Sequence, residues 1–236
     1  MKKKIVITGA SSGIGFALSK LLVEQGHTVF AISRNESRLS SLASSLSSAS
    51  LHLLVGDISK QQSLQSIHTS LAGHTDHIDA LINNAGTLIH KPFSELTFQN
   101  WLDIYSTNVF GAAMLTSALL PLLKRPDAKE KSHVVNIASM GGVQGSTKFA
   151  GLSAYSSSKG ALCNFTECLA EELKNDGVAV NALAIGSVAT EMFSAAFPGF
   201  KAATTPEKMA EFIAEFTLTG QNFFNGKILP VSNSTP

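Results

Sequence analysis

The chain has 236 residues, of which 44% are hydrophobic and 15% are charged. This length and apolar content fit one domain, residues 1–236, with a sizeable core. Eighteen Lys and Arg residues against 17 Asp and Glu residues leave a net charge of +1, which argues against a broad nucleic-acid-binding face.

The chain is expected to be cytoplasmic and to have no membrane partner. Only three apolar residues follow the basic start MKKK before polar residues return, too few for a signal-peptide core or a membrane span. Cys163 and Cys168 form no C-x-x-C pair, so we expect a reduced setting without a disulfide framework. No metal site is predicted, because His74 and His77 lack a Cys or carboxylate cluster to complete one.

Short apolar runs predict strands along the whole chain. They lack the polar alternation of a half-exposed strand, so both faces of the sheet should be buried. The predicted strands cover residues 4–8, 28–33, 51–56, 79–83, 133–138, 178–185 and 227–231.

Helical patterns separate these strands. Apolar residues from Ile14 to Leu22 recur at helical spacing, and Gly26 ends that helix. Residues 33–50 are rich in serine, but their leucines keep helical spacing and indicate a surface helix. A longer helix is predicted from an N-cap at Thr97 to about residue 120, where Pro121 ends it.

Another helix is predicted over about residues 153–175, with apolar residues on one stripe. Strand and helix alternate along the chain, which is typical of a parallel sheet covered by helices. The fold class is therefore α/β: a Rossmann-type, doubly wound, parallel sheet of about seven strands with helices on both faces.

The first strand runs directly into TGASSGIG, residues 8–15, and then into a helix. A helix N-terminus offers free backbone N–H groups and a positive dipole end. Three glycines, Gly9, Gly13 and Gly15, let a pyrophosphate approach that backbone closely. The stretch therefore predicts a dinucleotide site, although glycines alone would also suit a tight packing turn.

The end of the second strand predicts the cofactor. A carboxylate there would bind ribose hydroxyls and repel a 2′-phosphate. This chain has Ser33 and Arg34 instead, which can donate a hydrogen bond and grip a phosphate bidentately. NADP(H) is therefore favoured over NAD(H).

Several motifs in order resemble those of the short-chain dehydrogenase/reductase family, over nearly the whole chain. They are TGASSGIG (8–15), Asp57, NNAG (83–86), STNVFG (106–111), VVNIAS (134–139), YSSSK (155–159) and IGSVATEM (185–192). The resemblance implies an NADP(H)-dependent oxidoreductase that acts on a ketone or secondary alcohol, assembled as a homodimer or homotetramer through the helices at 97–120 and 153–175.

The resemblance also implies roles. Tyr155 would be the general acid or base, and Lys159 would hold the nicotinamide ribose and lower the Tyr155 pKa. Ser139 would polarise the substrate oxygen, and Asn108 would anchor a water in a proton relay. The implied cofactor-binding set comprises Gly9, Ser11, Ser12, Gly13, Ile14, Gly15, Ser33, Arg34, Asp57, Ile58, Asn83, Ala85, Gly86, Tyr155, Lys159, Val188 and Thr190.

Elementary chemistry supports the central pair. Residues four apart share one helix face, with Cβ atoms roughly 5–6 Å apart. A free tyrosine has a pKa near ~10, which is high for proton exchange at neutral pH, and a nearby ammonium lowers it. A serine hydroxyl aimed at the developing alkoxide adds stabilisation.

The chain departs from the family pattern in two places. The interval from Ser139 to Tyr155 is wider than usual, so a loop should bulge near the substrate mouth. Ile185 stands where the family usually has proline before Gly186, which frees the local backbone.

Residues 187–206 form the expected substrate segment, outside the carboxyl end of the sixth strand. Its apolar side chains, Met192, Phe193, Phe197 and Phe200, could form a lid or simply pack a short surface helix.

Two other functions are weighed against the oxidoreductase. A non-catalytic NADP(H)-binding sensor or partner-binding protein would share the fold, since fold alone does not give function. A sugar-nucleotide epimerase or dehydratase would need a longer C-terminal region than the roughly fifty residues after Gly186.

Overall fold

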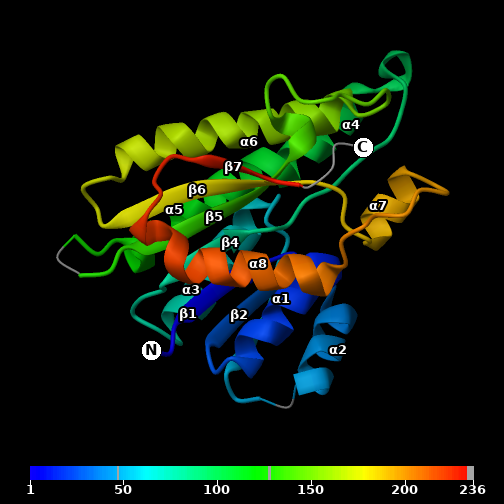
Figure 1. The fold of residues 1–236 in the computed structure, drawn as a ribbon. Helices are drawn as coiled ribbons and strands as arrows, with labels where there is room; N and C mark the ends of the chain where they lie inside the picture. The colour runs from blue at the N-terminus through cyan, green and yellow to red at the C-terminus, as the bar shows by residue number, and fades with distance from the viewer. Residues whose placement is uncertain (47, 127–128, 233–236) are drawn as a thin grey trace.

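The computed structural model describes residues 1–46, 48–126 and 129–232. Its centre is a seven-stranded parallel sheet with the order β3-β2-β1-β4-β5-β6-β7 (Figure 1). The sequence-based fold class is thereby confirmed. The strands are β1 (Lys4–Thr8), β2 (Thr28–Ser33), β3 (Leu51–Val55), β4 (Ala80–Asn83), β5 (Ser132–Ser139), β6 (Val178–Ile185) and β7 (Ile228–Val231).

Helices cover both faces of the sheet (Figure 1). One layer holds α1 (Gly13–Glu24), α2 (Glu36–Leu46) and α8 (Pro206–Thr219). The other layer holds α3 (Gln61–Ala72), α5 (Ala112–Leu123) and α6 (Ser153–Glu172). In β1, Ile5 and Ile7 pack into the first layer and Val6 packs into the second, which explains why the strand has no polar alternation.

The helix predicted over 97–120 begins as expected but changes character midway. Thr97 caps α4 (Phe98–Tyr105) in a capping box with Asn100. A π-helical turn, η2 (Ser106–Gly111), then leads into α5. Such turns insert one extra residue, and they are frequent at functional sites.

The prediction that Pro121 ends this helix is wrong, because α5 continues to Leu123 with the proline inside it. The last turn of α5 is stabilised by core packing and by a hydrogen bond from another segment. Leu122 and Leu123 are buried, and the carbonyl of Leu122 accepts a hydrogen bond of 2.9 Å from the Ile78 amide. Tertiary packing therefore offsets the backbone bond that proline cannot make.

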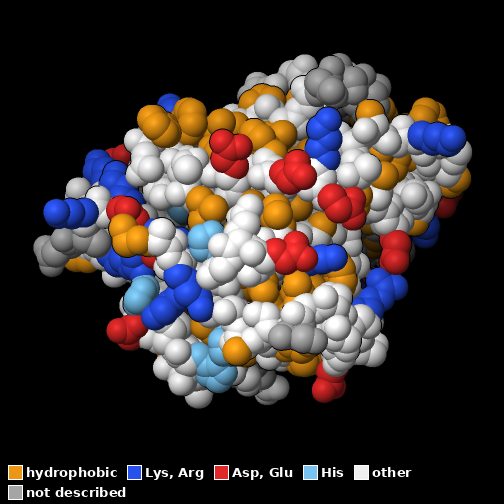
Figure 2. Space-filling model, turned by 60° about the horizontal axis from the view of Figure 1, so that its bottom comes forward, with side chains coloured by type: hydrophobic (Ala, Val, Ile, Leu, Met, Phe, Trp, Pro, Cys, Tyr) orange, Lys and Arg blue, Asp and Glu red, His pale blue; other side chains and the backbone are white. Residues whose placement is uncertain are grey.

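The continuous stretch Phe98–Leu123 has the length and apolar composition of a membrane span: an 18-residue window within it has a mean hydropathy of 1.4, and 44% of that window is buried within the fold. Elsewhere on the surface, acidic and basic side chains lie interspersed across the face shown in Figure 2. That distribution agrees with the near balance of the two charge signs in the sequence.

The chain between β6 and α8 leaves the sheet as an excursion that carries α7 (Glu191–Ala196) (Figure 1). Its two ends meet, since Val188 and Thr204 form an isolated parallel bridge and the Ala189 amide donates to the Thr204 carbonyl at 2.9 Å. All strands point the same way, so this excursion and the turns after β1, β4 and β5 gather at the carboxyl edge, where ligands bind in such sheets.

Candidate active site

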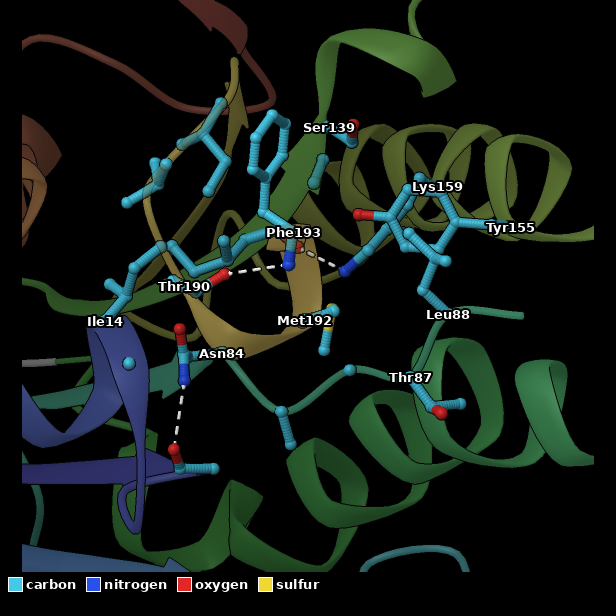
Figure 3. Close-up of a pocket in the computed structure, with 18 of the residues that line it drawn as sticks. Ile14, Asn84, Thr87, Leu88, Ser139, Tyr155, Lys159, Thr190, Met192 and Phe193 are labelled. Atoms are coloured by element: carbon cyan, nitrogen blue, oxygen red, sulfur yellow. Dashed lines mark hydrogen bonds between the residues drawn. The ribbon is translucent and has the colours of Figure 1, made fainter. Parts of the chain in front are cut away.

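A cavity of about 680 Å³ opens at the carboxyl edge of the sheet (Figure 3). Its walls come from the turn after β1, the ends of β2 to β6, the start of α6 and the excursion around α7. That volume lies in the usual range for a cofactor or substrate site.

The glycine-rich turn forms one end of the cavity. Gly9 and Gly13 have positive φ of 68° and 52°, a backbone conformation that side chains disfavour. A Cβ at Gly15 would lie 2.2 Å from the Gly9 carbonyl oxygen, so only glycine lets α1 start there. The N-cap residue Ser12 makes no side-chain capping bond, which leaves the first amides of α1 for an anionic ligand. This donor set fits a dinucleotide pyrophosphate.

Thr8, to which the motifs gave no role, connects the turn after β1 to the loop after β4. Its hydroxyl accepts hydrogen bonds from the amides of Asn84 and Ala85, both at 3.0 Å. The Asn84 side chain in turn donates to the Thr8 carbonyl at 2.9 Å. The turn after β1 and the loop after β4 are therefore one bonded unit.

Asn83, a predicted cofactor residue, lies behind the wall rather than on it. It is 2% exposed, and its amide donates to Thr116 at 3.1 Å and to Asn136 at 2.8 Å. Its neighbour Asn84 lines the cavity instead, with Ala85 and the following loop.

The corner expected to select the cofactor is formed by Ser33, Arg34 and Ser11, which all line the cavity. The Ser33 hydroxyl donates to the Ser11 hydroxyl at 2.8 Å. Arg34 is exposed, whereas Arg38 on α2 pairs with Glu191 of α7 at 2.9 Å. The corner thus carries hydroxyls and a guanidinium, a set suited to a phosphate.

Ser139, Tyr155 and Lys159 meet deeper in the cavity (Figure 3). Ser139 ends β5, and the other two lie one turn apart on α6. The Lys159 ammonium is buried, donates to the Ile137 carbonyl at 2.7 Å, and lies 6.0 Å from the centre of the Tyr155 ring. The predicted trio is brought together.

Burial acts on both titratable groups of this trio. It raises the pKa of Tyr155, and a hydrogen bond with Ser139 lowers it in part. Burial also lowers the pKa of Lys159 to about 8. The net direction for Tyr155 is upward, opposite to the lowering by Lys159 that the resemblance implies, because desolvation of the phenolate dominates and the ammonium is directed to the Ile137 carbonyl.

Asn108 sits in the π-helical turn, 1% exposed, behind the cavity wall that Thr107 lines. Its amide nitrogen donates to the Thr87 carbonyl at 3.0 Å and to the Ser158 hydroxyl at 2.9 Å. Its oxygen accepts from the Thr87 amide at 2.8 Å. The side chain therefore fixes the loop after β4 against α6.

Most of the other predicted residues lie on the wall. Val188 is buried there, and the Thr190 hydroxyl accepts from the Phe193 amide and caps α7. The predicted residues that line the cavity are Gly9, Ser11, Ser12, Gly13, Ile14, Ser33, Arg34, Asp57, Ile58, Ala85, Gly86, Ser139, Tyr155, Lys159, Val188 and Thr190. Gly15, Asn83 and Asn108 support the wall from behind.

The two departures from the family pattern both reach the cavity. After Ser139 the chain forms a short 3₁₀ turn, η3 (Met140–Gly142), and Ser146, Thr147 and Phe149 of the longer interval line the opening. Ile185 continues β6 with partners on both sides, Ser139 and Val231. Sequence reasoning did not single out Phe149, whose only signal was its place within the extra residues.

Comparisons with known proteins identify the family to which this chain is similar. A family model described as short chain dehydrogenase matches residues 3–199. A putative ketoacyl reductase of the monensin polyketide synthase from Streptomyces virginiae is 34% identical over 218 residues, which cover 90% of this chain and 82% of that protein.

Solved structures agree with the sequence relatives. A 3-ketoacyl-(acyl-carrier-protein) reductase from Brucella melitensis, complexed with NADH, has a TM-score of 0.87 at 26% identity, covering 97% of this chain and 96% of that one. A short chain dehydrogenase from Shigella flexneri, complexed with NADP, has a TM-score of 0.87 at 28% identity with the same coverage. The chain therefore belongs to the short-chain dehydrogenase/reductase family and is an NAD(P)-dependent oxidoreductase.

Proposed function

We propose that the protein transfers a hydride between NADP(H) and a ketone or secondary alcohol, with Tyr155 as the general acid or base. One observation carries this proposal: Ser139, Tyr155 and Lys159 line the same cavity as the glycine-rich turn. Tyr155, a proton donor, therefore lines the same cavity as the N-terminus of α1, which suits an anionic group.

The nicotinamide, when bound, supplies or accepts the hydride. In the reducing direction, Tyr155 donates its hydroxyl proton to the substrate oxygen, and Ser139 donates a hydrogen bond to the same oxygen as negative charge develops there. The raised pKa of Tyr155 keeps this acid protonated at neutral pH.

Lys159 places a cation 6.0 Å from the centre of the Tyr155 ring. Its pKa of about 8 leaves the ammonium mostly charged at neutral pH, so it favours the phenolate that Tyr155 becomes after donating its proton. Asn108 acts through position, since it fixes the loop at Thr87 against α6 beside Ser158.

The preference for NADP(H) is part of the proposal. It is supported by Ser33, Ser11 and Arg34 at the end of β2, where no carboxylate repels a 2′-phosphate. One solved relative is complexed with NADH and another with NADP, and in this chain the corner at Ser33 and Arg34 favours NADP(H).

The cofactor half is tested by titrating NADPH and NADH against the purified protein and following nicotinamide fluorescence. NADPH is expected to bind more tightly, and Arg34→Ala should weaken NADPH binding by roughly 10-fold while leaving NADH binding nearly unchanged, since one charged phosphate contact is removed. Arg38→Ala is the matched control, because Arg38 pairs with Glu191 and is not on the cavity wall. Tighter binding of NADH by the unmodified protein would contradict the assignment of Ser33 and Arg34.

A further inference from the structure

Five rings form a cluster around α7, and four of them lie on the cavity wall. Phe197 is its centre, with ring centroids 5.2 Å from Phe193, 5.8 Å from Phe149 and 5.8 Å from His90. The Phe200 ring completes the cluster at 6.4 Å, nearly perpendicular to Phe197. We call these five residues the ring cluster.

The ring cluster joins three segments that are far apart in sequence. His90 comes from the loop after β4, Phe149 from the extra residues before Tyr155, and Phe193 from α7. Backbone contacts fix the first two segments, since the Lys91 amide donates to the Gly151 carbonyl at 2.9 Å. Gly151 has a φ of 80°, and a Cβ there would lie 2.4 Å from the His90 ring. The rings are therefore held in place before a substrate arrives.

The rings also present surface to the substrate. Phe149, Phe193, Phe197 and Phe200 line the cavity that contains Ser139 and Tyr155, and each remains partly or largely exposed. Figure 3 shows Met192, Phe193 and Leu88 around the same opening as Tyr155. If the carbonyl oxygen of a ligand lies at Tyr155, the group attached to the carbonyl carbon lies in the same cavity as these rings.

Charge is sparse near the ring cluster. Arg34 and Asp57 belong to the nucleotide end, Lys159 lies under Tyr155, and Glu191 is paired with Arg38. Lys201 is exposed, so its ammonium can stay in water. The end near the ring cluster therefore suits an uncharged, apolar group.

We propose that the substrate is a ketone or secondary alcohol with an aromatic ring on the reacting carbon, and that Phe197 is a specificity-determining residue. This inference rests on the proposed function above. Aromatic pairs gain free energy beyond the area that they bury, which a saturated ring does not share. A flexible acyl chain would also lose more rotational entropy on binding than a rigid ring.

The test uses three ketones with NADPH: acetophenone, cyclohexyl methyl ketone and 2-butanone. The first two have the same carbon skeleton and differ in ring planarity and in conjugation of the ring with the carbonyl, so the ring contact is read from how Phe197→Leu changes their ratio. We expect kcat/KM for acetophenone to exceed that for cyclohexyl methyl ketone by about 10-fold, from one or more ring contacts. Phe197→Leu should reduce this ratio at least fivefold while changing kcat/KM for 2-butanone by no more than about twofold. The control is Phe223→Leu, at a residue that is 80% exposed and outside the cavity wall.

Each other outcome is decisive. An equal loss for all three ketones in Phe197→Leu would make the ring cluster a structural joint only and overturn the inference. A ratio of acetophenone to cyclohexyl methyl ketone that Phe197→Leu leaves unchanged would overturn it too, while the proposed function would stand. If the unmodified protein binds NADPH but reduces none of the three ketones, this inference fails, and a broader panel of ketones and secondary alcohols then decides the proposed function separately.

Discussion

Tyr155 and Lys159 lie one turn apart on α6, and burial moves their pKa values in opposite directions. The tyrosine becomes a weaker acid and the lysine a weaker base, so the neutral form of each is favoured. The two pKa values move apart, since that of Lys159 falls to about 8 while that of Tyr155 rises above its ordinary value. Tyr155 can therefore release its proton only if neighbouring groups stabilise the phenolate. We propose that Ser139 and the Lys159 ammonium do so.

Replacement of the proposed acid gives the residue-scale prediction. Tyr155→Phe keeps the ring on the cavity wall and removes the proton that the substrate oxygen receives. We expect kcat to fall by about 10²–10⁴-fold, the usual contribution of general acid catalysis. NADPH affinity should stay within about threefold, because the variant keeps the donors of the glycine-rich turn.

Stopped-flow reduction of the best ketone measures kcat, and nicotinamide fluorescence measures binding. Tyr105→Phe is the matched control, since that hydroxyl bonds to Ser157 at 3.1 Å outside the trio. Retention of full activity in Tyr155→Phe would remove Tyr155 from the mechanism.

At the scale of elements, a buried histidine joins β5 to β6 and α8. His133 is 1% exposed, and its Nδ1 lies 3.1 Å from the Thr217 carbonyl. Its Nε2 faces the Asn181 amide nitrogen at 3.0 Å. The orientation of Asn181 is fixed, because its oxygen accepts from the Lys227 amide and its nitrogen donates to the Phe224 carbonyl. The joint therefore requires a neutral imidazole, with a proton on Nδ1 and none on Nε2.

This joint predicts acid sensitivity. Burial lowers the pKa of His133 from 6.5 to about 4, so the unfolded chain binds more protons than the folded one between those values. Stability from this group is full above pH 6.5 and is lost as pH falls toward 4. It should contribute about 2 kcal/mol of the stability lost between pH 7 and pH 5.

Urea unfolding at pH 7 and pH 5 measures this loss. His133→Gln should be less stable than the unmodified protein at pH 7 but lose about 2 kcal/mol less on acidification. His68→Gln, on α3 and partly exposed, serves as the control. An unchanged pH dependence in His133→Gln would show that other groups cause the acid sensitivity.

The strands were predictable because burial on both faces leaves uninterrupted apolar runs; β1, β2 and β6 have the predicted bounds. The π-helical turn in the predicted 97–120 helix was not predictable, since STNVFG contains no proline and the turn depends on contacts such as that of Asn108 with Thr87. In NNAG the sequence could not tell which asparagine faces the cavity. Strand parity decides it: Asn83 ends β4 facing the core, and Asn84 follows on the wall.

At the scale of the whole molecule, an apolar stripe remains on the surface of α4, η2 and α5. Phe98 is 78% exposed, and Phe110 and Met114 are each 53% exposed. With Leu102 they recur at multiples of four residues, which places them along one side of this helical stretch. Exposed apolar patches of this kind mark interaction surfaces.

We therefore propose that two copies of the chain associate through this stripe. Light scattering after size-exclusion chromatography should give twice the chain mass of 24.9 kDa, or a higher even multiple. The double substitution Phe110→Lys and Met114→Lys should shift the protein to monomers, because it places charge in a desolvated contact. Phe223→Lys, on another exposed ring, is the control. A monomeric unmodified protein at micromolar concentration would contradict the assembly.

The bridge between Val188 and Thr204 closes the base of the α7 excursion, which affects how the substrate segment of such a protein can evolve. Val188 and Thr204 meet at its base, so the chain enters and leaves at nearly one point and β6 and α8 do not depend on what lies between. Residues 189–203 thus form a segment that can be exchanged between relatives as one unit. Grafting the corresponding stretch of a relative between these two positions, with Thr190 and Glu191 retained, exchanges the cavity side chains of α7 while the sheet stays as it is.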